Sequence, residues 1–492
     1  MIRTHTIADT ASIRDAMNLI EQAPAKICIV TDEGGVLQRT LTDGDIRRAL
    51  LSGDSLDMLI THMSGTPKTP VIAPVDASRD VLKALLHTEQ VRAIVLVDGE
   101  NRPVGLVDKN QFENLVLLSP PHMGETEATF VAQAFSENWV APAGPNIAAF
   151  EAVLAKTTGR KHALALSSGT AALHLALRVL NVKPHDRVYV SNLTFIASLQ
   201  PVYYEQAVPV LIDSEPDTWN MSPLALKRRL EKDAAADTLP TAIIVVHIYG
   251  QSANIAALCA LADLYGIPVI EDAAESLGAT YQNMPSGSHG VLAAYSFNGN
   301  KIITTAGGGA LVSDDAALIA RAQMLSTQGR DPAEHYQHST VAYNYRMSNI
   351  LAGIGRGQVA ILPERVAARR EVFQRYQNGF ADIAGLSFQA DSAGSKGSRW
   401  LTVLNLDPDH IDIHPYQLIR RLRSQNIEAR AGWKPMNMQP LCADLDFEPH
   451  SAKETVSSAL FLRTICLPSG SSMLPDIQDR VINSIRSILK GS

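Results

Sequence analysis

The chain has 492 residues, of which 46% are hydrophobic and 19% are charged, and its formal net charge is −7. This composition is typical of a globular protein and excludes a disordered or fibrous chain. The length exceeds that of one ordinary core, so we expect two or three folding units. The acidic balance and the lack of a long Lys/Arg run argue against nucleic acid or a membrane as partner and favour a small molecule.

The N-terminus and the cysteines indicate the compartment. Residues 1–20 lack the basic, apolar and small-residue order of a signal peptide, and no apolar run has spanning length. Cys28, Cys259, Cys442 and Cys466 are scattered without a CxxC pair, which argues against disulfides and a zinc site. We therefore predict a cytoplasmic protein without a metal centre.

Two stretches near the start share the order strand, turn, strand and helix. Asp43-Gly44-Asp45 opens the first helix, which continues to Leu51, and the second helix is expected over about 109–117. The strands are expected at residues 27–31, 36–41, 93–97 and 104–107.

Residues 1–118 resemble a pair of CBS motifs. In that family a hydroxyl residue and an acid three positions later hold a nucleotide ribose, and here Thr42 and Asp45 occupy these places. The second copy has Asp108 and Gln111 instead, so the resemblance implies at most one adenine-nucleotide site. The alternative is that Asp43 and Asp45 only cap a helix.

Pro120 and Pro121 end the first region, because consecutive prolines extend neither a helix nor the interior of a sheet. From Glu125 onward, strand-like runs alternate with helical patterns, which predicts an α/β fold with a mostly parallel sheet covered by helices. After about Val366 a long amphipathic helix leads into a smaller α+β region that ends in a helix over 476–489. Strands are expected at 188–191, 208–213, 242–248, 268–272, 293–297, 309–313 and 400–405.

An enzyme that uses pyridoxal 5′-phosphate (PLP) needs a lysine, a carboxylate beside the pyridine nitrogen and a phosphate cup. Ser167-Ser168-Gly169-Thr170 precedes a helix, so free amides, a hydroxyl and the positive helix end converge on one point. Asp272 ends a buried strand, where ligands of open α/β sheets bind and where a protonated pyridinium would pair with it. Each feature alone has an ordinary structural alternative, because the Ser-Gly-Thr run could simply cap the helix and Asp272 could cap the next turn.

Lys301 is the most specific feature. Its neighbours are uncharged, so partial burial is expected to lower its pKa towards reactivity. The glycines Gly307 to Gly309, which follow it, allow a close approach of the backbone.

These features together resemble the DegT/DnrJ/EryC1/StrS sugar aminotransferases, which are fold-type I PLP enzymes. The resemblance implies a large PLP-binding domain over 119–365 and a small C-terminal domain over 366–492, behind the CBS pair over 1–118. The matching blocks are residues 168–175, 192–197, 271–275, 296–301 and 343–347.

The resemblance also implies a role for each matching residue. Asn344 would reach the cofactor phosphate of the neighbouring subunit, which implies a homodimer with a shared active site and an inactive monomer. Glu275, where the family often has Gln, is expected near the phenolic oxygen of the cofactor. The remaining cofactor contacts would be Lys301 as the residue that binds the cofactor and moves the proton, Asp272 at the pyridine nitrogen, Phe195 on the ring, and Gly169, Thr170 and Ser296 at the phosphate.

Within the family, segments 119–124, 295–305 and 466–470 resemble the UDP-4-amino-4,6-dideoxy-N-acetylglucosamine transaminases of bacillosamine synthesis. This implies transfer of an amino group from L-glutamate to C4 of a UDP-linked 4-keto-6-deoxy-N-acetylhexosamine. Some residues are candidates both for sugar-nucleotide contact and for structural roles: His122, Trp139, Arg399, Trp400, Arg430 and Trp433.

Two alternatives stay open. One is a 4-aminotransferase or a 3,4-dehydratase that acts on a GDP- or dTDP-linked sugar. The dehydratase relatives carry His in place of the lysine, so Lys301 favours transamination. The other is a nucleotide-sensing CBS protein whose C-terminal half is a non-catalytic scaffold. We also expect that an adenine nucleotide at the CBS pair tunes the transaminase.

Overall fold

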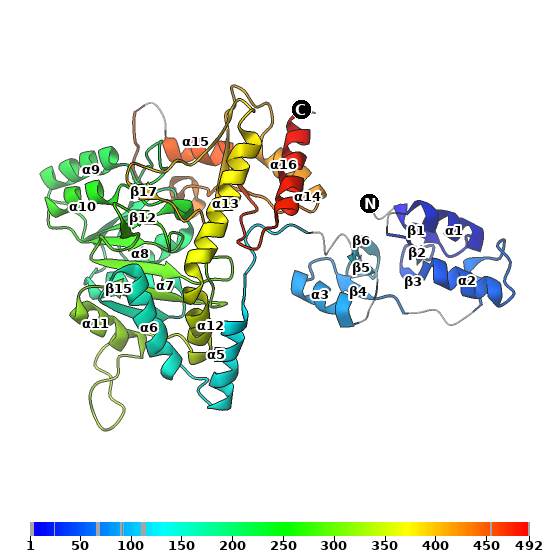
Figure 1. The fold of residues 1–492 in the computed structure, drawn as a ribbon, viewed down its shortest axis with the longest axis horizontal. Coiled ribbons are helices and arrows are strands. Elements are labelled where there is room, and N and C mark those ends of the chain that lie inside the picture. The colour runs from blue at the N-terminus through cyan, green and yellow to red at the C-terminus, as the bar shows by residue number, and fades with distance from the viewer. Residues whose placement is uncertain are drawn as a thin grey trace. The chain divides into compact units, whose positions relative to one another are not determined.

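The structure is a computed structural model that describes residues 4–23, 25–64, 69–88, 91, 93–109, 115–452 and 455–490. The chain forms two compact units, Met1–Leu115 and Val116–Ser492 (Figure 1). Gln111 and most of the helix expected over 109–117 lie outside the described residues. Among the described helices, none combines the length and the apolar character needed to cross a bilayer.

The N-terminal unit repeats one order of elements. The first copy comprises β1 (Thr6–Ala8), α1 (Ile13–Gln22), β2 (Ile27–Thr31), β3 (Leu37–Thr42) and α2 (Asp43–Leu51), and the second comprises β4 (Ile72–Pro74), α3 (Arg79–Thr88), β5 (Ala93–Val97) and β6 (Pro103–Asp108). In both copies the first two strands pair in parallel and the third is antiparallel. The pairing register shifts at the same place, after Val30 and after Leu96. The repeat predicted from the sequence is therefore present.

The large sheet of the second unit is almost entirely parallel. Its strands are β7 (His162–Leu166), β8 (Arg187–Ser191), β9 (Val208–Ile212), β10 (Ala242–Val246), β11 (Val269–Asp272), β14 (Leu292–Ser296), β15 (Gly309–Ser313) and β20 (Asp446–Glu448). The strand order is β20-β9-β8-β10-β11-β14-β15-β7. β15 runs antiparallel to both of its neighbours, β14 and β7, and the other described strand pairs of this sheet are parallel. The predicted α/β class is therefore confirmed.

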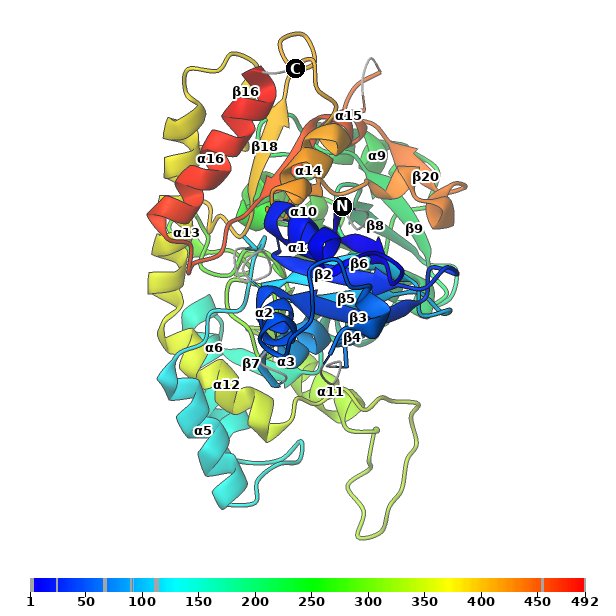
Figure 2. The same cartoon turned by 90° about the vertical axis from the view of Figure 1, so that its right-hand side faces the viewer.

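Helices cover both faces of this sheet because successive side chains of a strand point to opposite faces. Leu164 and Leu166 pack in the cluster that contains α7, whereas Ala165 between them packs in the opposite one. One face is covered by α7 (Gly169–Val179), α8 (Gln200–Tyr204) and α11 (Ala316–Ser326). The other face is covered by α6 (Pro145–Thr158), α9 (Pro223–Ala235), α10 (Ile255–Asp263) and α12 (Asn349–Ala360). On that side α5 (Glu125–Ser136) packs on α12 (Figure 2).

A smaller antiparallel sheet follows in the chain, with the order β16-β18-β21-β19. Its strands are β16 (Leu386–Phe388), β18 (Thr402–Leu406), β21 (Thr464–Leu467) and β19 (Arg430–Ala431). Three helices share its core, α13 (Leu362–Phe380), α14 (Pro415–Ser424) and α16 (Pro475–Lys490), and Figure 2 shows α16 beside α13. Other short elements of this unit include β12 (Thr280–Tyr281), β13 (Met284–Pro285), β17 (Ser395–Lys396) and α15 (Val456–Arg463).

Candidate active site

The predicted cofactor residues meet at the carboxyl edge of the large sheet. Asp272 ends β11, Ser296 ends β14, and Gly169 begins α7 directly after β7. These strands are parallel to one another, so their carboxyl ends face one crevice, which is where ligands of open α/β sheets bind. The topology therefore brings together residues that lie more than a hundred positions apart.

Three of the predicted phosphate contacts, Gly169, Thr170 and Ser296, lie at or beside the start of α7. The Ser168 hydroxyl accepts a hydrogen bond from the Ala171 N–H at 3.0 Å and so caps the helix. A Cβ atom on Gly169 would lie 3.0 Å from the Cβ of Ser296, and one on Gly309 would lie 2.3 Å from the carbonyl carbon of Ser168. The two glycines thus let Ser296 approach the free N–H groups of the helix. Thr170, the third contact, follows Gly169 and is half-buried.

Asp272 is held in place by hydroxyl and amide donors. Its side chain is buried, and its Oδ2 accepts a hydrogen bond from the Ser198 hydroxyl at 2.6 Å. Its Oδ1 accepts one from the Ala274 N–H at 3.1 Å. The Ser198 hydroxyl also lies 2.6 Å from the Thr194 hydroxyl. These charge-assisted bonds fix the orientation of the carboxylate.

Lys301 lies in the loop between β14 and β15. The Thr305 N–H donates to the Phe297 carbonyl at 2.9 Å, which closes the loop around the lysine. The side chain is 14% exposed, and its Nζ lies 3.7 Å from Oε1 of Glu275. Burial lowers the pKa of Lys301, although the charges of Glu275 and Asp272 oppose the shift. A lowered pKa favours the neutral amine, which is the form that a nucleophile requires.

Glu275 follows β11 and is almost completely buried. Its Oε2 accepts a hydrogen bond from the Tyr249 N–H at 2.7 Å. Tyr249 has a φ of 56°, a left-handed conformation that directs this N–H and costs a non-glycine residue about 1–3 kcal/mol. Burial raises the pKa of Glu275, while the charge of Lys301 opposes the shift. A protonated carboxyl group can donate a hydrogen bond, which a carboxylate cannot.

Three aromatic side chains line one side of this region. The rings of Phe195 and Trp433 lie 5.5 Å apart, and Trp433 stacks on Tyr249 at 6.3 Å and 13°. The backbone N–H of Trp433 donates to the Tyr249 hydroxyl at 2.7 Å. Phe195 is 52% exposed, whereas Tyr249 is buried. The ring of Phe195 therefore offers an open apolar face.

These groups fit PLP, which combines a planar ring, a ring nitrogen, an aldehyde and a phosphate. The open face of Phe195 suits the ring, and the fixed carboxylate of Asp272 suits a protonated ring nitrogen. The partly buried amine of Lys301 suits the aldehyde, and the free N–H groups beside Gly169 suit the phosphate. Four complementary groups thus converge from four parts of the chain.

Of the predicted substrate residues, Trp433 contacts the ring of Phe195, as described above. His122 lies on the segment that follows Pro120 and Pro121. His122 is half-buried, with Nδ1 at 3.1 Å from the Ser471 hydroxyl and Nε2 at 3.2 Å from an Arg365 nitrogen. Burial lowers the pKa of His122, and the positive charges of Arg365 and Arg369 lower it further.

Trp139 and Arg430 lie on the surface. Trp139 is 47% exposed, before α6 in the chain. Arg430 is exposed and pairs with Glu428 at 2.7 Å. Neither residue contacts Lys301 or Asp272 in the described hydrogen-bond and ion-pair network.

Protein atoms cover two further predicted substrate residues, Arg399 and Trp400, and substrate contact stays a prediction for both. Arg399 is 6% exposed, pairs with Asp391 at 2.9 Å and donates to the Gln389 carbonyl at 2.8 Å. Trp400 is 1% exposed, and its indole N–H donates to the Asn300 carbonyl at 2.7 Å. Their polar groups are therefore committed to internal partners.

The structure also places two unpredicted residues at the site. Ser198 donates to Asp272, and it directly follows the 192–197 block, so a hydroxyl at that spacing was a usable signal. Tyr249 contributes through its backbone N–H, which leaves no mark in the sequence.

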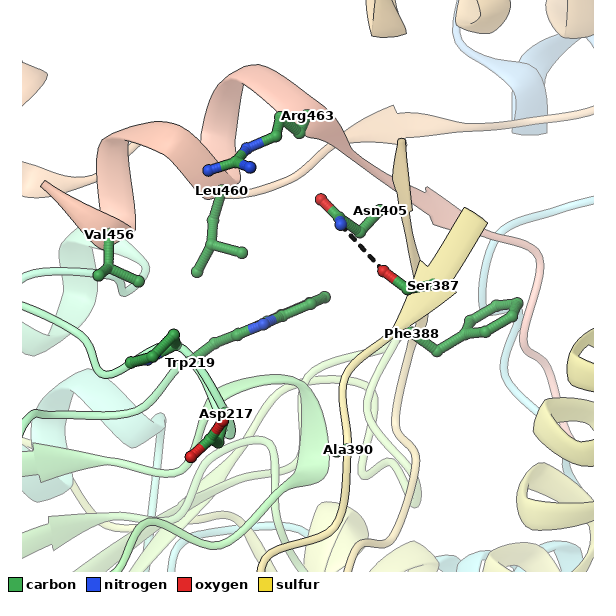
Figure 3. Close-up of a pocket in the computed structure, with 10 residues that line it drawn as sticks. Asp217, Trp219, Ser387, Phe388, Ala390, Asn405, Val456, Leu460 and Arg463 are labelled. Carbon is green, nitrogen blue, oxygen red and sulfur yellow. Dashed lines mark hydrogen bonds between the residues drawn. The ribbon is translucent and has the colours of Figure 1, made fainter. Parts of the chain in front are cut away.

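A separate cavity of about 350 Å³ lies between the loop after β9, the small sheet and α15 (Figure 3). Trp219, Asn405, Leu460 and Arg463 are among the residues that line this cavity (Figure 3). None of the predicted cofactor or substrate residues lines it. This cavity is therefore distinct from the Lys301 site.

Comparisons with known proteins agree with this chemistry. The model of the DegT/DnrJ/EryC1/StrS aminotransferase family matches residues 121–486. EpsN of Bacillus subtilis, named as a pyridoxal phosphate-dependent aminotransferase, is 52% identical over 367 residues, which cover 75% of this chain and 94% of EpsN. GDP-perosamine synthase of Caulobacter vibrioides is 34% identical over 375 residues, which cover 76% of this chain and 98% of the synthase.

Solved structures share the fold. A DegT DnrJ EryC1 StrS aminotransferase from Brucella abortus has a TM-score of 0.69 and 26% identity, and the match covers 74% of this chain and 95% of that one. Spr1654 of Streptococcus pneumoniae in its PLP form has a TM-score of 0.68 and 25% identity, with 77% and 99% covered. The chain therefore belongs to the DegT/DnrJ/EryC1/StrS aminotransferase family and is a PLP-dependent sugar aminotransferase.

Proposed function

We propose that this enzyme transfers the amino group of L-glutamate to the C4 ketone of a UDP-linked 4-keto-6-deoxy-N-acetylhexosamine. The observation that carries the proposal is the convergence of Lys301, Asp272 and the start of α7 at one edge of the sheet. The presence of a lysine in this loop supports transamination over dehydration. The UDP-linked sugar rests on the sequence segments 119–124, 295–305 and 466–470.

Bound PLP supplies an electron sink for the carbanion of the substrate. Lys301 would bind the cofactor covalently through Nζ, and its amine, once freed, would move the proton at the reacting carbon. Asp272, oriented by Ser198, holds the ring nitrogen in its protonated form. Phe195 packs on the ring face, which its exposure leaves open.

The phosphate and the phenolic oxygen have their own partners in this proposal. Gly169, Thr170 and Ser296 bind the phosphate, which the close approach around Gly169 supports. Glu275 lies near the phenolic oxygen and 3.7 Å from Lys301 Nζ. Its raised pKa supports a role as a hydrogen-bond donor to that oxygen.

The active site is shared within a homodimer in this proposal. Asn344 is exposed, so it is free to reach the phosphate of the neighbouring subunit. The long loop before it, which projects beyond α11 in Figure 1, carries Tyr336 at 81% and Val341 at 79% exposure. Apolar side chains this exposed on one loop are typical of a surface that a partner covers.

The nucleotide specificity is tested on the purified enzyme by visible absorbance. Glutamate is expected to bleach the band of the lysine-bound cofactor, and UDP-4-keto-6-deoxy-N-acetylglucosamine is expected to restore it. We expect kcat/KM for this sugar to exceed that for a GDP- or dTDP-linked 4-keto-6-deoxyhexose at least about 10-fold. If only the GDP-linked sugar restored the band, a GDP-linked substrate would replace the UDP-linked one in this proposal. The likeness to GDP-perosamine synthase supports that alternative.

For the N-terminal unit we propose a CBS pair over 1–118, ahead of a large domain over 119–365 and a small domain over 366–492. The repeated order of strands and helices supports this. The Thr42 hydroxyl lies 2.6 Å from Oδ2 of Asp45 at the start of α2, where a ribose hydroxyl would compete for both groups. We propose that an adenine nucleotide binds there and changes the turnover of the transaminase.

Replacing Asp45 with alanine is expected to weaken AMP or ATP binding at least about 10-fold, because a ribose hydroxyl loses a charged acceptor. Isothermal titration measures this, with turnover recorded with and without the nucleotide. The Ser12 and Asp15 side chains form the same capping arrangement at α1. Asp15→Ala therefore controls for the lost cap, worth about 1 kcal/mol. Equal nucleotide affinity in wild-type protein and Asp45→Ala would contradict the site.

A further inference from the structure

The carbonyl of Asn300, the residue before Lys301, accepts hydrogen bonds from two distant side chains. The Ser119 hydroxyl donates at 2.6 Å and the Trp400 indole N–H donates at 2.7 Å. A carbonyl oxygen has two lone pairs, so both are used and the peptide that leads into Lys301 is fixed. The Trp400 ring also faces the amine, since its centroid lies 3.9 Å from Lys301 Nζ.

A buried arginine connects both donors. Arg369 on α13 is 1% exposed and donates to the Ser119 hydroxyl at 3.0 Å. It also donates to the carbonyls of Trp400, at 2.5 Å, and Ser469, at 3.0 Å. Burial lowers the pKa of Arg369 to about 9, with a contribution from Arg365. A guanidinium with these neutral acceptors is costly to bury, and its planar fork of donors ties the three segments together.

The segment that carries Ser119 is itself anchored. The Leu118 N–H donates to Oε2 of Glu428 at 2.8 Å, and the Leu118 carbonyl accepts from the Ser469 N–H at 2.7 Å. Ser119 therefore meets the Asn300 carbonyl from a fixed backbone and not from a free loop.

We propose that Trp400 and Ser119 are positioning residues for Lys301, which hold its loop through the Asn300 carbonyl and hold its ammonium against the Trp400 ring. The inference rests on the proposed role of Lys301 as the residue that binds the cofactor and moves the proton. A lysine side chain has four rotatable bonds, and a misplacement of about 1 Å costs about 10²-fold in rate. A cation over an indole face is stabilised, so the ring also holds Lys301 in place whenever its amine is protonated.

Separate variants isolate the N–H and the ring of Trp400 in the holoenzyme. Trp400→Phe keeps a ring but removes the N–H, and we expect kcat to fall about 10-fold with KM for the keto-sugar within about twofold. Trp400→Leu also removes the ring, and we expect a loss of about 100-fold in kcat. We further expect the pH midpoint of the visible band to fall by about half a unit in Trp400→Leu but not in Trp400→Phe.

Ser119 offers a rescue test and Tyr376 offers a matched control. Ser119→Ala is expected to lower kcat about 5-fold, and Ser119→Thr, which keeps the hydroxyl, is expected to restore it. Tyr376, on α13 like Arg369, is buried, and its hydroxyl donates to the Pro468 carbonyl at 2.9 Å. Tyr376→Phe thus removes another buried donor to a carbonyl and is expected to leave kcat and the band midpoint unchanged.

Wild-type kcat and band midpoint in both Trp400→Leu and Ser119→Ala would overturn the inference while leaving Lys301 in its role. A wild-type protein without a lysine-bound band, or full turnover in Lys301→Ala, would instead remove the proposed role of Lys301, and the inference with it. Should Trp400→Leu fail to fold, Trp400→Phe and Ser119→Ala still decide the outcome, because both preserve the packing.

Discussion

Replacing Lys301 with alanine is expected to lower kcat by at least about 10³-fold, because it removes both the covalent attachment of PLP and the group that moves the proton. The visible band of the lysine-bound cofactor is expected to disappear as well. Lys301→Arg keeps a positive charge next to Glu275, but a guanidinium stays protonated and cannot replace the amine. We therefore expect Lys301→Arg to be as inactive as the alanine variant.

Turnover and absorbance of the three proteins measure this. Lys183 is exposed, and its backbone N–H, not its side chain, bonds Asp186 at 2.9 Å, so Lys183→Ala is the matched control. It is expected to retain wild-type kcat and the visible band. Full turnover in Lys301→Ala with PLP bound at normal occupancy would contradict the assignment of Lys301.

The strands of the large sheet were predictable where local pattern decides them. Uninterrupted apolar runs predicted β8, β10 and β15 to within two residues at most ends. The sequence did not predict β7, because His162-Ala163-Leu164-Ala165-Leu166 is short and contains two alanines, which are not enriched in strands. It did not predict β20 either, because that strand pairs with β9 from more than two hundred residues away.

The residues of the candidate site also fall into those that local sequence pattern predicts and those that depend on tertiary packing. Gly169, Asp272 and Lys301 follow strand ends or precede a helix, so topology alone brings them to one edge. Trp400 was not predictable in this way. Tryptophan is a residue type typical of ligand contacts, but whether this one is buried depends on how the loop before β18 packs. Arg369 lies in a run of charged residues typical of an exposed helix face, and only the tertiary structure shows that it is buried.

Glu271, next to Asp272 on β11, is expected to matter for stability. It is completely buried, and its carboxylate accepts hydrogen bonds from His247 Nε2 at 2.9 Å and from three backbone N–H groups of the loop before β14. Although burial alone raises its pKa, the hydrogen bond and charge of His247 and the N–H of Gly290 lower the pKa of Glu271 to about 2, from an ordinary 4.5. The folded state therefore favours the carboxylate form.

Glu271→Gln is expected to lower the free energy of unfolding at pH 7 by roughly 3 kcal/mol, because the shifted pKa and the buried acceptor are both lost. The lowered pKa makes this stabilisation fully present above about pH 4.5 and removes it as the pH falls towards 2. Urea titrations followed by tryptophan fluorescence measure the effect, since all four tryptophans of the chain lie after residue 116 and report on the second unit alone.

Glu231 provides the control for this substitution. It is exposed and pairs with Lys227 at 3.8 Å on the same helix, so Glu231→Gln is expected to change the free energy of unfolding by less than about 0.5 kcal/mol. The gap between the two variants should therefore be wide at pH 7 and close as the pH approaches 2, where wild-type Glu271 is itself protonated. A gap that stays constant with pH would mean that the loop contacts of Glu271 depend on its shape and not on its charge.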